Sequence, residues 1–269
     1  MKAEFLITGA SGQLGRALLR LLGERAAGTD LPRLDVTSAR SVVDAVDALD
    51  PLWIVNCAAV TDVDRCEREP ELAMKVHRDG VANLAAAGRR LLTISTDHVF
   101  TGEKGRDRPF LEDDRTCPAN QYGRSKLMGE MEALSSGPGN IVVRTSWMFS
   151  HTEGLVPFIW RSLSRRGRVM AVGDQQACLT YAPDLAAAIV QLMERDRSGV
   201  FHLVNRPGMT PAGVADLAVR ETGGEVRRVD WSDLDLDAPR PFYSELGTSR
   251  GVELPGIQSA LERWKERNV

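Results

Sequence analysis

A glycine-rich turn close to the start is the feature that most constrains the fold of this chain. A short apolar run, Phe5–Thr8, leads into GASGQLG, in which Gly9, Gly12 and Gly15 recur at every third position before a helical leucine pattern begins. In a strand–turn–helix unit such glycines allow a tight turn, close approach of a pyrophosphate to the backbone, and close packing of the helix on the strand. The free N–H groups of the helix N-terminus also favour phosphate. The turn therefore predicts a dinucleotide site; the alternative is a glycine-rich turn that holds no ligand.

Short apolar runs and helical patterns alternate along the first half of the chain. The runs that we expect to form strands are Phe5–Thr8, Ala26–Asp30, Trp53–Ala59, Leu91–Thr96 and Ile141–Thr145. The spacing of apolar residues predicts helices over Gln13–Leu22, Ala39–Leu49 and Glu71 to about Gly88. This alternation predicts the α/β class, with a doubly wound parallel sheet of Rossmann type. Such sheets bind ligands at the carboxyl ends of their strands, where each motif below lies.

The alternation loosens after Ser146. We expect helices over Leu155–Arg165, Asp184–Glu194, Pro211–Glu221 and Ile257–Arg267, and strands over Val169–Val172 and Val200–Asn205. The pattern predicts a dinucleotide-binding domain over residues 1–150, to which a segment of about 176–205 returns. Residues 151–175 and 206–269 are then expected to form a smaller, C-terminal substrate-binding lobe.

The composition is ordinary for a soluble globular protein, with 43% hydrophobic and 26% charged residues. A formal net charge of −3 gives no indication of a nucleic-acid or membrane partner. No stretch reaches the ~18 apolar residues of a membrane span, and the start, MKAEFLITGAS, lacks the apolar core of a signal peptide. We therefore expect a cytoplasmic protein. We expect no metal site either, because the four cysteines lack the spacing of metal ligands: Cys57, Cys66, Cys117 and Cys178.

Acidic residues after the second expected strand bear on the choice of cofactor. Asp30 follows the glycines by about 20 residues, where an acid accepts from the ribose 2′-hydroxyl and repels a 2′-phosphate. That position favours NADH, but Arg33 and Arg16 are near enough to offset the repulsion, so NADPH and NADH both stay open. Asp35 and Val36 begin the next segment and are expected to contact adenine, unless the aspartate is a cap instead.

A tyrosine and a lysine indicate the chemistry. Tyr122 and Lys126 stand four apart in PANQYGRSK and so share one helix face. A nearby cation lowers the pKa of a phenol, which is about 10 when unperturbed, and Lys126 is also expected to hold the nicotinamide ribose. Thr96, followed by Asp97, ends the fourth strand and offers a hydroxyl to a substrate carbonyl. Together they predict hydride transfer with Tyr122 as proton donor; the alternative for the pair is an exposed amphipathic helix.

Residues near the other strand ends are further candidates. Ala58 and Ala59, after the third strand, leave room for a cofactor across the sheet edge, although ordinary tight packing also selects small residues. His77 and His98 are candidates for substrate contacts, each with a purely structural role as the alternative.

The assembled residues resemble those of the extended short-chain dehydrogenase/reductases, and more closely the dTDP-4-dehydrorhamnose reductase family. The resemblance runs almost from end to end. It is carried by GASGQLG, NCAAVTDVDRCEREPELA, STDHVF, PANQYGRSKLMGE, VVRTSWMF, DQQACLTYAPDLA, RPFYSELGTS and LPGIQSALERW. So many matches in order are far more specific than a tyrosine and a lysine four apart.

The resemblance implies roles for individual residues. Thr96, Tyr122 and Lys126 would form the catalytic set, with Asp97 beside them. The residues implied to bind the cofactor are Gly9, Ser11, Gly12, Gln13, Leu14, Asp30, Asp35, Ala58 and Ala59. Those implied to face the sugar nucleotide are Val60, Thr61, Trp147, Thr180 and Tyr181. Members of this family reduce the 4-keto group of a dTDP-linked 6-deoxy-4-keto-hexose.

The chain departs from the family pattern where the sugar would lie. His98 stands where the family usually has Tyr, and HRDG at 77–80 stands where it usually has Asn-Ala-Thr-Gly. ACLT at 177–180 replaces Gly-x-Pro-Thr, and LV at 155–156 replaces Asn-Phe. These changes lead to the hypothesis of an active reductase whose 4-keto sugar is not the rhamnose precursor.

The sequence thus predicts an NAD(P)H-dependent 4-ketoreductase of nucleotide-linked sugars, with a homodimer as a possible assembly. One alternative is an epimerase or dehydratase of the same superfamily, which would retain NAD tightly. Another is a non-catalytic regulatory subunit that binds NAD(P) on the same fold, as in the regulatory subunit of methionine adenosyltransferase. A shared fold does not by itself decide between these functions.

Overall fold

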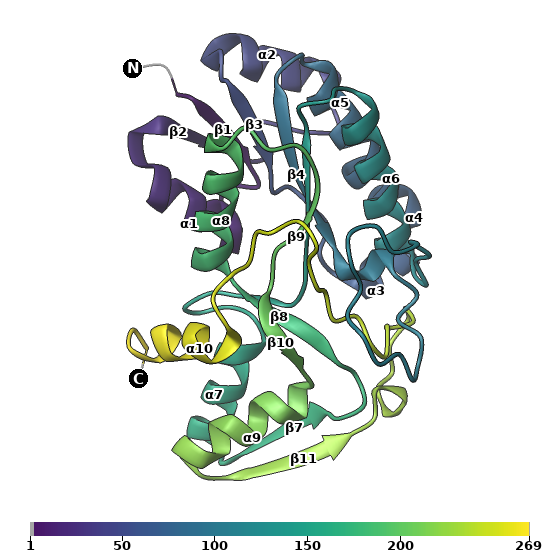
Figure 1. The fold of residues 1–269 in the computed structure, drawn as a ribbon, viewed down its shortest axis with the longest axis vertical. Coiled ribbons are helices and arrows are strands. Elements are labelled where there is room, and N and C mark those ends of the chain that lie inside the picture. The colour runs from purple at the N-terminus through teal and green to yellow at the C-terminus, as the bar shows by residue number, and fades with distance from the viewer. Residues whose placement is uncertain (1–2, 269) are drawn as a thin grey trace.

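A six-stranded parallel sheet forms the centre of the computed structural model, which describes residues 3–268 (Figure 1). Met1 and Lys2, the start of the stretch expected to lack a signal peptide, and Val269 lie outside the described residues. The strand order is β2-β1-β3-β4-β5-β9, which places the reversal of the chain path between β1 and β3. The strands are β1 (Phe5–Thr8), β2 (Ala26–Thr29), β3 (Trp53–Asn56), β4 (Arg90–Thr96), β5 (Ile141–Thr145) and β9 (Gly199–His202). The expectation of a doubly wound parallel sheet is confirmed.

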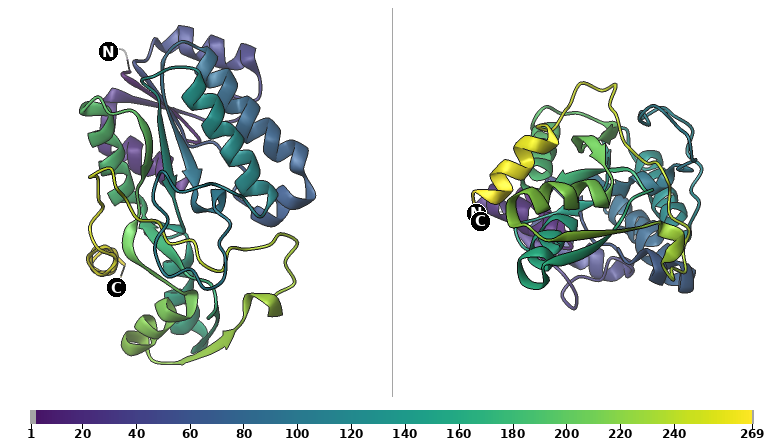
Figure 2. Two further views of the ribbon diagram at one scale, coloured as in Figure 1. Left: turned by 45° about the vertical axis from the view of Figure 1, so that its right-hand side comes forward. Right: turned by 90° about the horizontal axis from the view of Figure 1, so that it is seen from below.

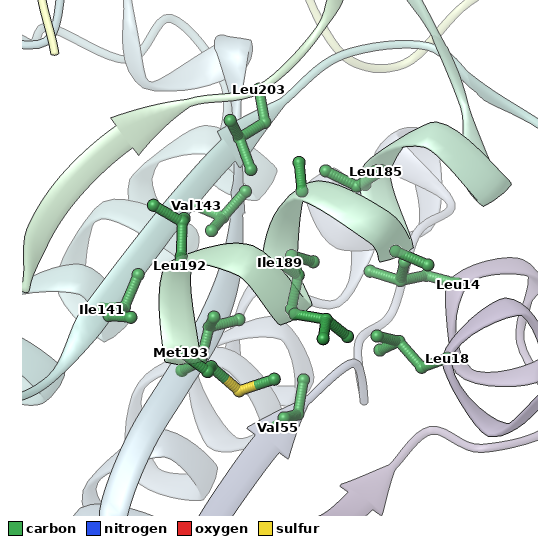
Figure 3. Close-up of a cluster of buried hydrophobic side chains, with 14 of the residues drawn as sticks. Leu14, Leu18, Val55, Ile141, Val143, Leu185, Ile189, Leu192, Met193 and Leu203 are labelled. Carbon is green, nitrogen blue, oxygen red and sulfur yellow. The ribbon is translucent and has the colours of Figure 1, made fainter. Parts of the chain in front are cut away.

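Alternate residues of the strands pack on opposite faces of the sheet. Phe5 and Ile7 point to one hydrophobic cluster and Leu6 to another, because successive side chains of a strand point to opposite sides. The first face is covered by α1 (Gln13–Leu22) and α8 (Ala182–Glu194), whose apolar side chains meet over the sheet (Figure 3). The helices on the other face are α2 (Ala39–Leu49), α5 (Gly80–Ala86) and α6 (Gln121–Ser135).

The smaller lobe is built on two short sheets below the main one (Figures 1 and 2). Its strands are β6 (Met148–Phe149), β7 (Arg168–Val172), β8 (Ala177–Tyr181), β10 (Asn205–Met209) and β11 (Glu225–Val229), ordered β10-β8-β6 and β11-β7. Its helices are α7 (Leu155–Arg166), α9 (Pro211–Thr222) and α10 (Ile257–Lys265), which share one hydrophobic cluster. Strands β6, β8 and β11 are absent from the elements expected above, and the strand expected over Val200–Asn205 ends at His202, with β10 beginning at Asn205.

Two segments of the C-terminal half return to the dinucleotide-binding half. The first is α8 with β9, which pairs with β5 in the main sheet. Strand β8 lies within the range expected to return, but it pairs with β6 and β10 in the lobe. The second segment is residues 240–248. Its Leu246 forms an isolated β-bridge with Phe110, and its Ser244 donates to Asp97, the residue after β4. The chain therefore returns to the dinucleotide-binding half in two separate segments.

The long helix expected over Glu71 to about Gly88 is confirmed as one continuous helical run. It consists of α4 (Pro70–Met74), a π-helical turn (Lys75–Asp79) and α5, and a further helix, α3 (Val63–Arg68), precedes it. The π-helical turn directs His77 inward, where it is buried. Within the described residues, no helix is long and apolar enough to span a membrane.

Candidate active site

A large cavity opens between the carboxyl ends of the central strands and the lobe, with a volume of about 1040 Å³. The glycine turn lines one part of it and the ends of β3, β4 and β5 line the middle. Residues of the lobe, among them Trp147 and Leu155, close the other side. The cavity therefore lies where a doubly wound sheet is expected to bind ligands.

The glycine turn brings β1, β3 and α1 into close contact. Gly9 has a φ of +65°, and a Cβ built on it would lie 2.5 Å from the carbonyl carbon of Cys57. A Cβ on Gly15 would lie 2.4 Å from the carbonyl oxygen of Gly9. Both positions exclude a side chain, so the helix N-terminus can approach the sheet edge.

The N-terminus of α1 leaves backbone N–H groups free for a phosphate. Its N-cap is Gly12, which has no side-chain cap, and the first turn contains no acidic residue. The buried Oε1 atom of Gln13 also has no hydrogen-bond partner among the described residues, and as an acceptor it suits an N–H or O–H donor of a ligand rather than a phosphate oxygen. Unpaired N–H groups at a helix N-terminus favour an anion, so this end of the cavity fits the pyrophosphate of a dinucleotide.

The two aspartates have different surroundings. Asp30 lines the cavity and accepts a hydrogen bond from the backbone N–H of Ser11 at 2.6 Å. Asp35 also lines the cavity, but it accepts from the N–H and hydroxyl of Thr37 at 2.9 and 2.8 Å, which hold its pKa below the usual range. Asp35 therefore caps a turn as well as facing the site, while Ser38 is the N-cap of α2.

Asn56 ties three strands together beneath the cavity. Its Oδ1 accepts from the Thr8 hydroxyl at 2.7 Å and from the Ala58 N–H at 3.2 Å, and its Nδ2 donates to Thr93 at 3.1 Å. Ala58 and Ala59 line the cavity directly after it. This network aligns the carboxyl ends of β1, β3 and β4, so that the loops after them lie along the same edge of the sheet.

Tyr122 and Lys126 lie on the first turns of α6 and both face the cavity. Asn120 caps the helix by accepting from the Gly123 N–H at 2.8 Å. Lys126 is only 6% exposed, and burial lowers its pKa to about 8. Burial raises the pKa of Tyr122 above its ordinary value, and Asp97 adds to this rise, while a hydrogen bond with Thr96 opposes it. The expectation of a lowered phenol pKa is therefore wrong, and Tyr122 is a neutral phenol at pH 7.

Asp97 organises the end of β4. It accepts from the hydroxyls of Thr96 at 3.1 Å, Ser146 at 2.9 Å and Ser244 at 2.5 Å. The three donors come from β4, from the residue after β5, and from the returning segment 240–248. The buried carboxylate thus fixes the position of Thr96 beside Tyr122.

The cavity brings together most of the residues expected to form the site. Those that line it are Gly9, Ser11, Gly12, Gln13, Leu14, Asp30, Asp35, Val36, Ala58, Ala59, Val60, Thr61, Thr96, Asp97, His98, Tyr122, Lys126 and Trp147. Thr180 and Tyr181 were expected to face the substrate, but neither is among the described residues that line the cavity. Both are buried behind it, where Thr180 accepts from Thr145 and the hydroxyl of Tyr181 contacts His151. Burial in the β6–β8 sheet accounts for the difference.

Several lining residues have no counterpart in the sequence-based assignments. They include Ser146, Glu153, Gln175 and Arg240. Glu153 forms an ion pair with Arg16 of α1 at 2.8 Å, which links the lobe to the dinucleotide-binding half. Gln175 and Arg240 lie within two of the stretches that carry the family resemblance, which was the available signal.

Comparison with known proteins identifies the family. The family model described as the RmlD substrate binding domain matches residues 2–267. The chain belongs to this family. The match confirms the resemblance carried by the ordered motifs.

Relatives of this RmlD-family chain cover it nearly completely. A dTDP-4-dehydrorhamnose reductase from Streptomyces griseus is 38% identical over 281 residues, covering 98% of this chain and 91% of that protein. A dTDP-4-keto-6-deoxy-D-glucose reductase from Streptomyces niveus is 37% identical over 259 residues, covering 92% and 89%. The crystal structure of dTDP-4-dehydrorhamnose reductase from Bacillus anthracis in complex with NADP has a TM-score of 0.93 at 30% identity and covers 100% of both chains.

Two of the residues that the sequence analysis set apart from the family pattern, His77 and His98, contact Tyr122. The rings of His77 and His98 meet the Tyr122 ring edge-on, with centroids 5.7 and 5.6 Å away. His77 accepts from the Val60 N–H at 3.0 Å and contacts the Ser125 hydroxyl at 2.8 Å. Burial lowers the pKa of His77 to about 2 and lowers that of His98 as well, so both rings are neutral at pH 7. His98 lines the cavity, whereas His77 supports its wall.

Proposed function

We propose that this protein reduces the 4-keto group of a dTDP-linked 6-deoxy-4-keto-hexose with NADPH, as an oxidoreductase of deoxysugar biosynthesis. The observation that carries the proposal is the meeting of Thr96, Tyr122 and Lys126 in the same cavity as the glycine turn. The relatives at 37–38% identity bear the names of two such reductases. They support reduction over an epimerase, a dehydratase or a non-catalytic subunit.

The dinucleotide end of the cavity would hold the pyrophosphate of the cofactor at the α1 N-terminus, with Asp30 near the adenosine ribose. The Oε1 atom of Gln13 would accept from a donor group of the cofactor. Lys126, which lines the same cavity as the glycine turn and Tyr122, would donate to the nicotinamide ribose. When bound, the reduced nicotinamide supplies the hydride. The related Bacillus anthracis structure in complex with NADP supports NADPH as that cofactor.

Tyr122 would supply the proton. Because its pKa is raised, the phenol carries its proton at neutral pH and can donate a hydrogen bond to a ketone oxygen. The Thr96 hydroxyl, whose single proton is donated to Asp97 in the structure, would turn that proton toward the same oxygen when substrate binds. As hydride reaches the carbonyl carbon, the developing alkoxide takes the phenolic proton, and the product is a secondary alcohol. The positive charge of Lys126 would then favour the tyrosinate that remains.

A test of the function is oxidation of NADPH with a panel of dTDP-, UDP- and GDP-linked 4-keto-6-deoxy sugars. The panel includes dTDP-4-dehydrorhamnose and dTDP-4-keto-6-deoxy-D-glucose, since the relatives are named for both. Running NADH in parallel measures the cofactor preference. Efficient turnover of dTDP-4-dehydrorhamnose relative to the other sugars would reject the hypothesis of a different sugar, which rests on His77, His98 and the two other departures.

Replacing Tyr122 with Phe removes the proton donor and keeps the ring. We expect kcat to fall by roughly 100-fold or more, because a positioned general acid contributes about that much. The dissociation constant for NADPH, measured by fluorescence titration, is expected to stay within about twofold. Normal kcat in Tyr122→Phe would contradict the proposed chemistry.

We infer a homodimer, which light scattering of the purified protein would test, and a cytoplasmic site of action, which cell fractionation would test. Exposed apolar side chains of α6, Met131 and Leu134, support a protein contact on that helix.

A further inference from the structure

His77 lies in a small buried network to which the proposed reaction gives no role. It belongs to the π-helical turn Lys75–Asp79 and is only 1% exposed. In Figure 1 the helical run from α4 to α5 lies beside α6, against which this turn packs. The two are so close that the carbonyl oxygen of His77 leaves no room for a Cβ at Gly129 of α6. The packing therefore fixes the backbone of His77 relative to the helix that carries Tyr122.

The hydrogen bonds of the His77 ring are compatible with one tautomer. The backbone N–H of Val60 donates to Nε2 at 3.0 Å, and because a backbone N–H cannot accept in return, Nε2 carries no proton. Burial lowers the pKa of the ring to about 2, so the ring is neutral at pH 7 and its single proton is on Nδ1. Nδ1 lies 2.8 Å from the hydroxyl oxygen of Ser125. His77 therefore accepts from Val60 and donates to Ser125.

Ser125 continues this chain of hydrogen bonds to the catalytic tyrosine. The serine is buried, and its hydroxyl donates to the backbone carbonyl of Tyr122 at 2.9 Å while it accepts from His77. The His77 ring also meets the Tyr122 ring edge-on, with centroids 5.7 Å apart and an angle of 82° between the planes. His77 therefore acts on Tyr122 in two ways, through Ser125 and through direct ring contact.

The other end of the chain of hydrogen bonds is the loop after β3. Ala58, Ala59 and Val60 of this loop line the cavity. The backbone of Val60 is held at both sides, because its N–H donates to His77 and its carbonyl accepts from the Cys66 thiol at 3.4 Å. Removing the histidine acceptor would leave the Val60 N–H unpaired, which favours a shift of the loop. Nε2 of His77 therefore sets the position of this cavity wall.

We propose that His77 is a positioning residue that holds the loop Ala58–Val60 and the start of α6 in one fixed arrangement. It is not among the described residues that line the cavity, so it acts through Val60 and Tyr122 rather than on a ligand. Because the loop is assigned to the cofactor and α6 carries the proton donor, loss of the Nε2 contact should weaken cofactor binding and loss of the Nδ1 contact should slow turnover. The prediction for turnover rests on the proposed function, whereas the prediction for cofactor binding does not.

Two variants separate the roles of the two nitrogen atoms. His77→Gln places an amide oxygen near the position of Nε2, so it keeps the acceptor for Val60 and loses the donor to Ser125. We expect kcat to fall by about tenfold or more, since a small misplacement of a catalytic group can cost up to about 100-fold, and the Kd of NADPH to stay within about twofold.

His77→Asn places an amide nitrogen near the position of Nδ1, so it keeps the donor to Ser125 and loses the acceptor for Val60. We expect the Kd of NADPH, measured by fluorescence titration, to rise by about threefold or more, the effect of one lost hydrogen bond, and kcat to fall by less than about threefold. The same effect of both variants on kcat and Kd, or the reverse pattern, would overturn the proposal.

Ser125→Ala breaks the same chain of hydrogen bonds one step closer to Tyr122. We expect kcat to fall about as far as in His77→Gln, and the double variant to be no slower than Ser125→Ala alone, because both changes remove the same connection. Losses that multiply in the double variant would indicate two independent packing defects and would contradict the proposal.

His202→Gln is the matched control. His202 is almost as deeply buried, at 2%, and meets the Phe100 ring edge-on at the same 5.7 Å and 82°. Its Nδ1 lies within hydrogen-bond distance of the carbonyls of Phe110 and Gly247, and His202 is not among the described residues that line the cavity. The control should be less stable in urea but keep kcat within about twofold of the wild-type value, because it leaves the hydrogen bonds to Tyr122 intact. A fall in kcat equal to that of His77→Gln would show that loss of any buried ring is sufficient.

The tautomer of His77 provides a measurement that does not depend on turnover. The chain has four histidines, so the NMR signals of protein labelled with ¹⁵N-histidine can be assigned from single variants. At pH 7 we expect Nδ1 of His77 to carry the proton and Nε2 to carry none. A protonated Nε2 would overturn the proposal, because it could not accept from Val60.

Two patterns separate this inference from the proposed function. If His77 has the expected tautomer and the Kd of NADPH distinguishes His77→Asn from His77→Gln, but no sugar of the panel is reduced, the proposed function fails and the positioning role stands. If the wild-type protein reduces a sugar while neither variant changes kcat or Kd, the function stands and the inference fails.

Discussion

The charge of Lys126 depends on how deeply α6 packs against the sheet. Desolvation of the ammonium group lowers its pKa to about 8, although the nearby Glu130 opposes this shift. A lysine on an open helix surface would stay protonated up to a pH of about 10. The buried position therefore brings the protonation of a catalytic side chain close to physiological pH.

The pH profile of the reductase is expected to show this group. The lowered pKa means that Lys126 loses its proton as pH rises, so kcat/KM should be level below about pH 7.5 and fall above about pH 8. In Lys126→Arg, which keeps its charge, the value at low pH should be smaller but the fall near pH 8 should disappear. A wild-type profile that stays level to about pH 10 would show that this charge is not needed.

At the scale of the elements, a buried ion pair fastens α6 to the sheet. Arg144 of β5 contacts both carboxylate oxygens of Glu130 at 2.9 and 2.7 Å, and Ser95 of β4 donates to the same carboxylate. Both charged side chains are almost fully buried. Since α6 carries Tyr122 and Lys126, this contact sets the distance between the catalytic helix and the strand ends.

Arg144→Met tests that contact. It leaves the Glu130 carboxylate buried without its partner, and we expect a loss of about 3–5 kcal/mol in the free energy of unfolding, measured by urea denaturation. The double variant with Glu130→Met removes both charges and should recover much of the loss. A double variant as unstable as the single one would show that packing, rather than an unpaired charge, dominates.

At the scale of the whole molecule, the returning segment 240–248 joins the lobe to the catalytic centre. Ser244 donates to Asp97, which lies 147 positions earlier in the chain, and Leu246 forms an isolated β-bridge with Phe110. The same segment carries Arg240. The site is therefore complete only when the C-terminal part of the chain has folded back over the end of β4.

Ser244→Ala is expected to loosen this closure. Removing a hydroxyl donor from a buried carboxylate should lower the free energy of unfolding by about 1–3 kcal/mol. Because Asp97 positions Thr96, kcat should fall as well, by several-fold or more. Ser232→Ala, at an exposed serine of the same lobe, is the control and should lie within about 0.5 kcal/mol of wild type. Equal stability and kcat in Ser244→Ala and the control would show that the contact has no role.

The sequence by itself determined the features that depend on neighbouring residues. The bounds of β1, β5, α1 and α2 agree with the expected ranges, because strand and helix periods are local properties of the chain. The glycine turn and the pair Tyr122 and Lys126 were recognisable for the same reason. Each motif needs its residues within one turn or one strand end, so the dinucleotide half of the site could be located without coordinates.

Only the tertiary structure decided the features that depend on distant segments. The placement of Gln175 and Arg240 in the cavity, the burial of Thr180 and Tyr181 behind it, and the π-helical turn at His77 each follow from contacts across long stretches of chain. The raised pKa of Tyr122 belongs with them, since desolvation depends on everything packed around the phenol rather than on the lysine four residues away. The local sequence pattern thus identified the catalytic residues. Long-range packing determined the pKa of Tyr122 and formed the substrate side of the cavity.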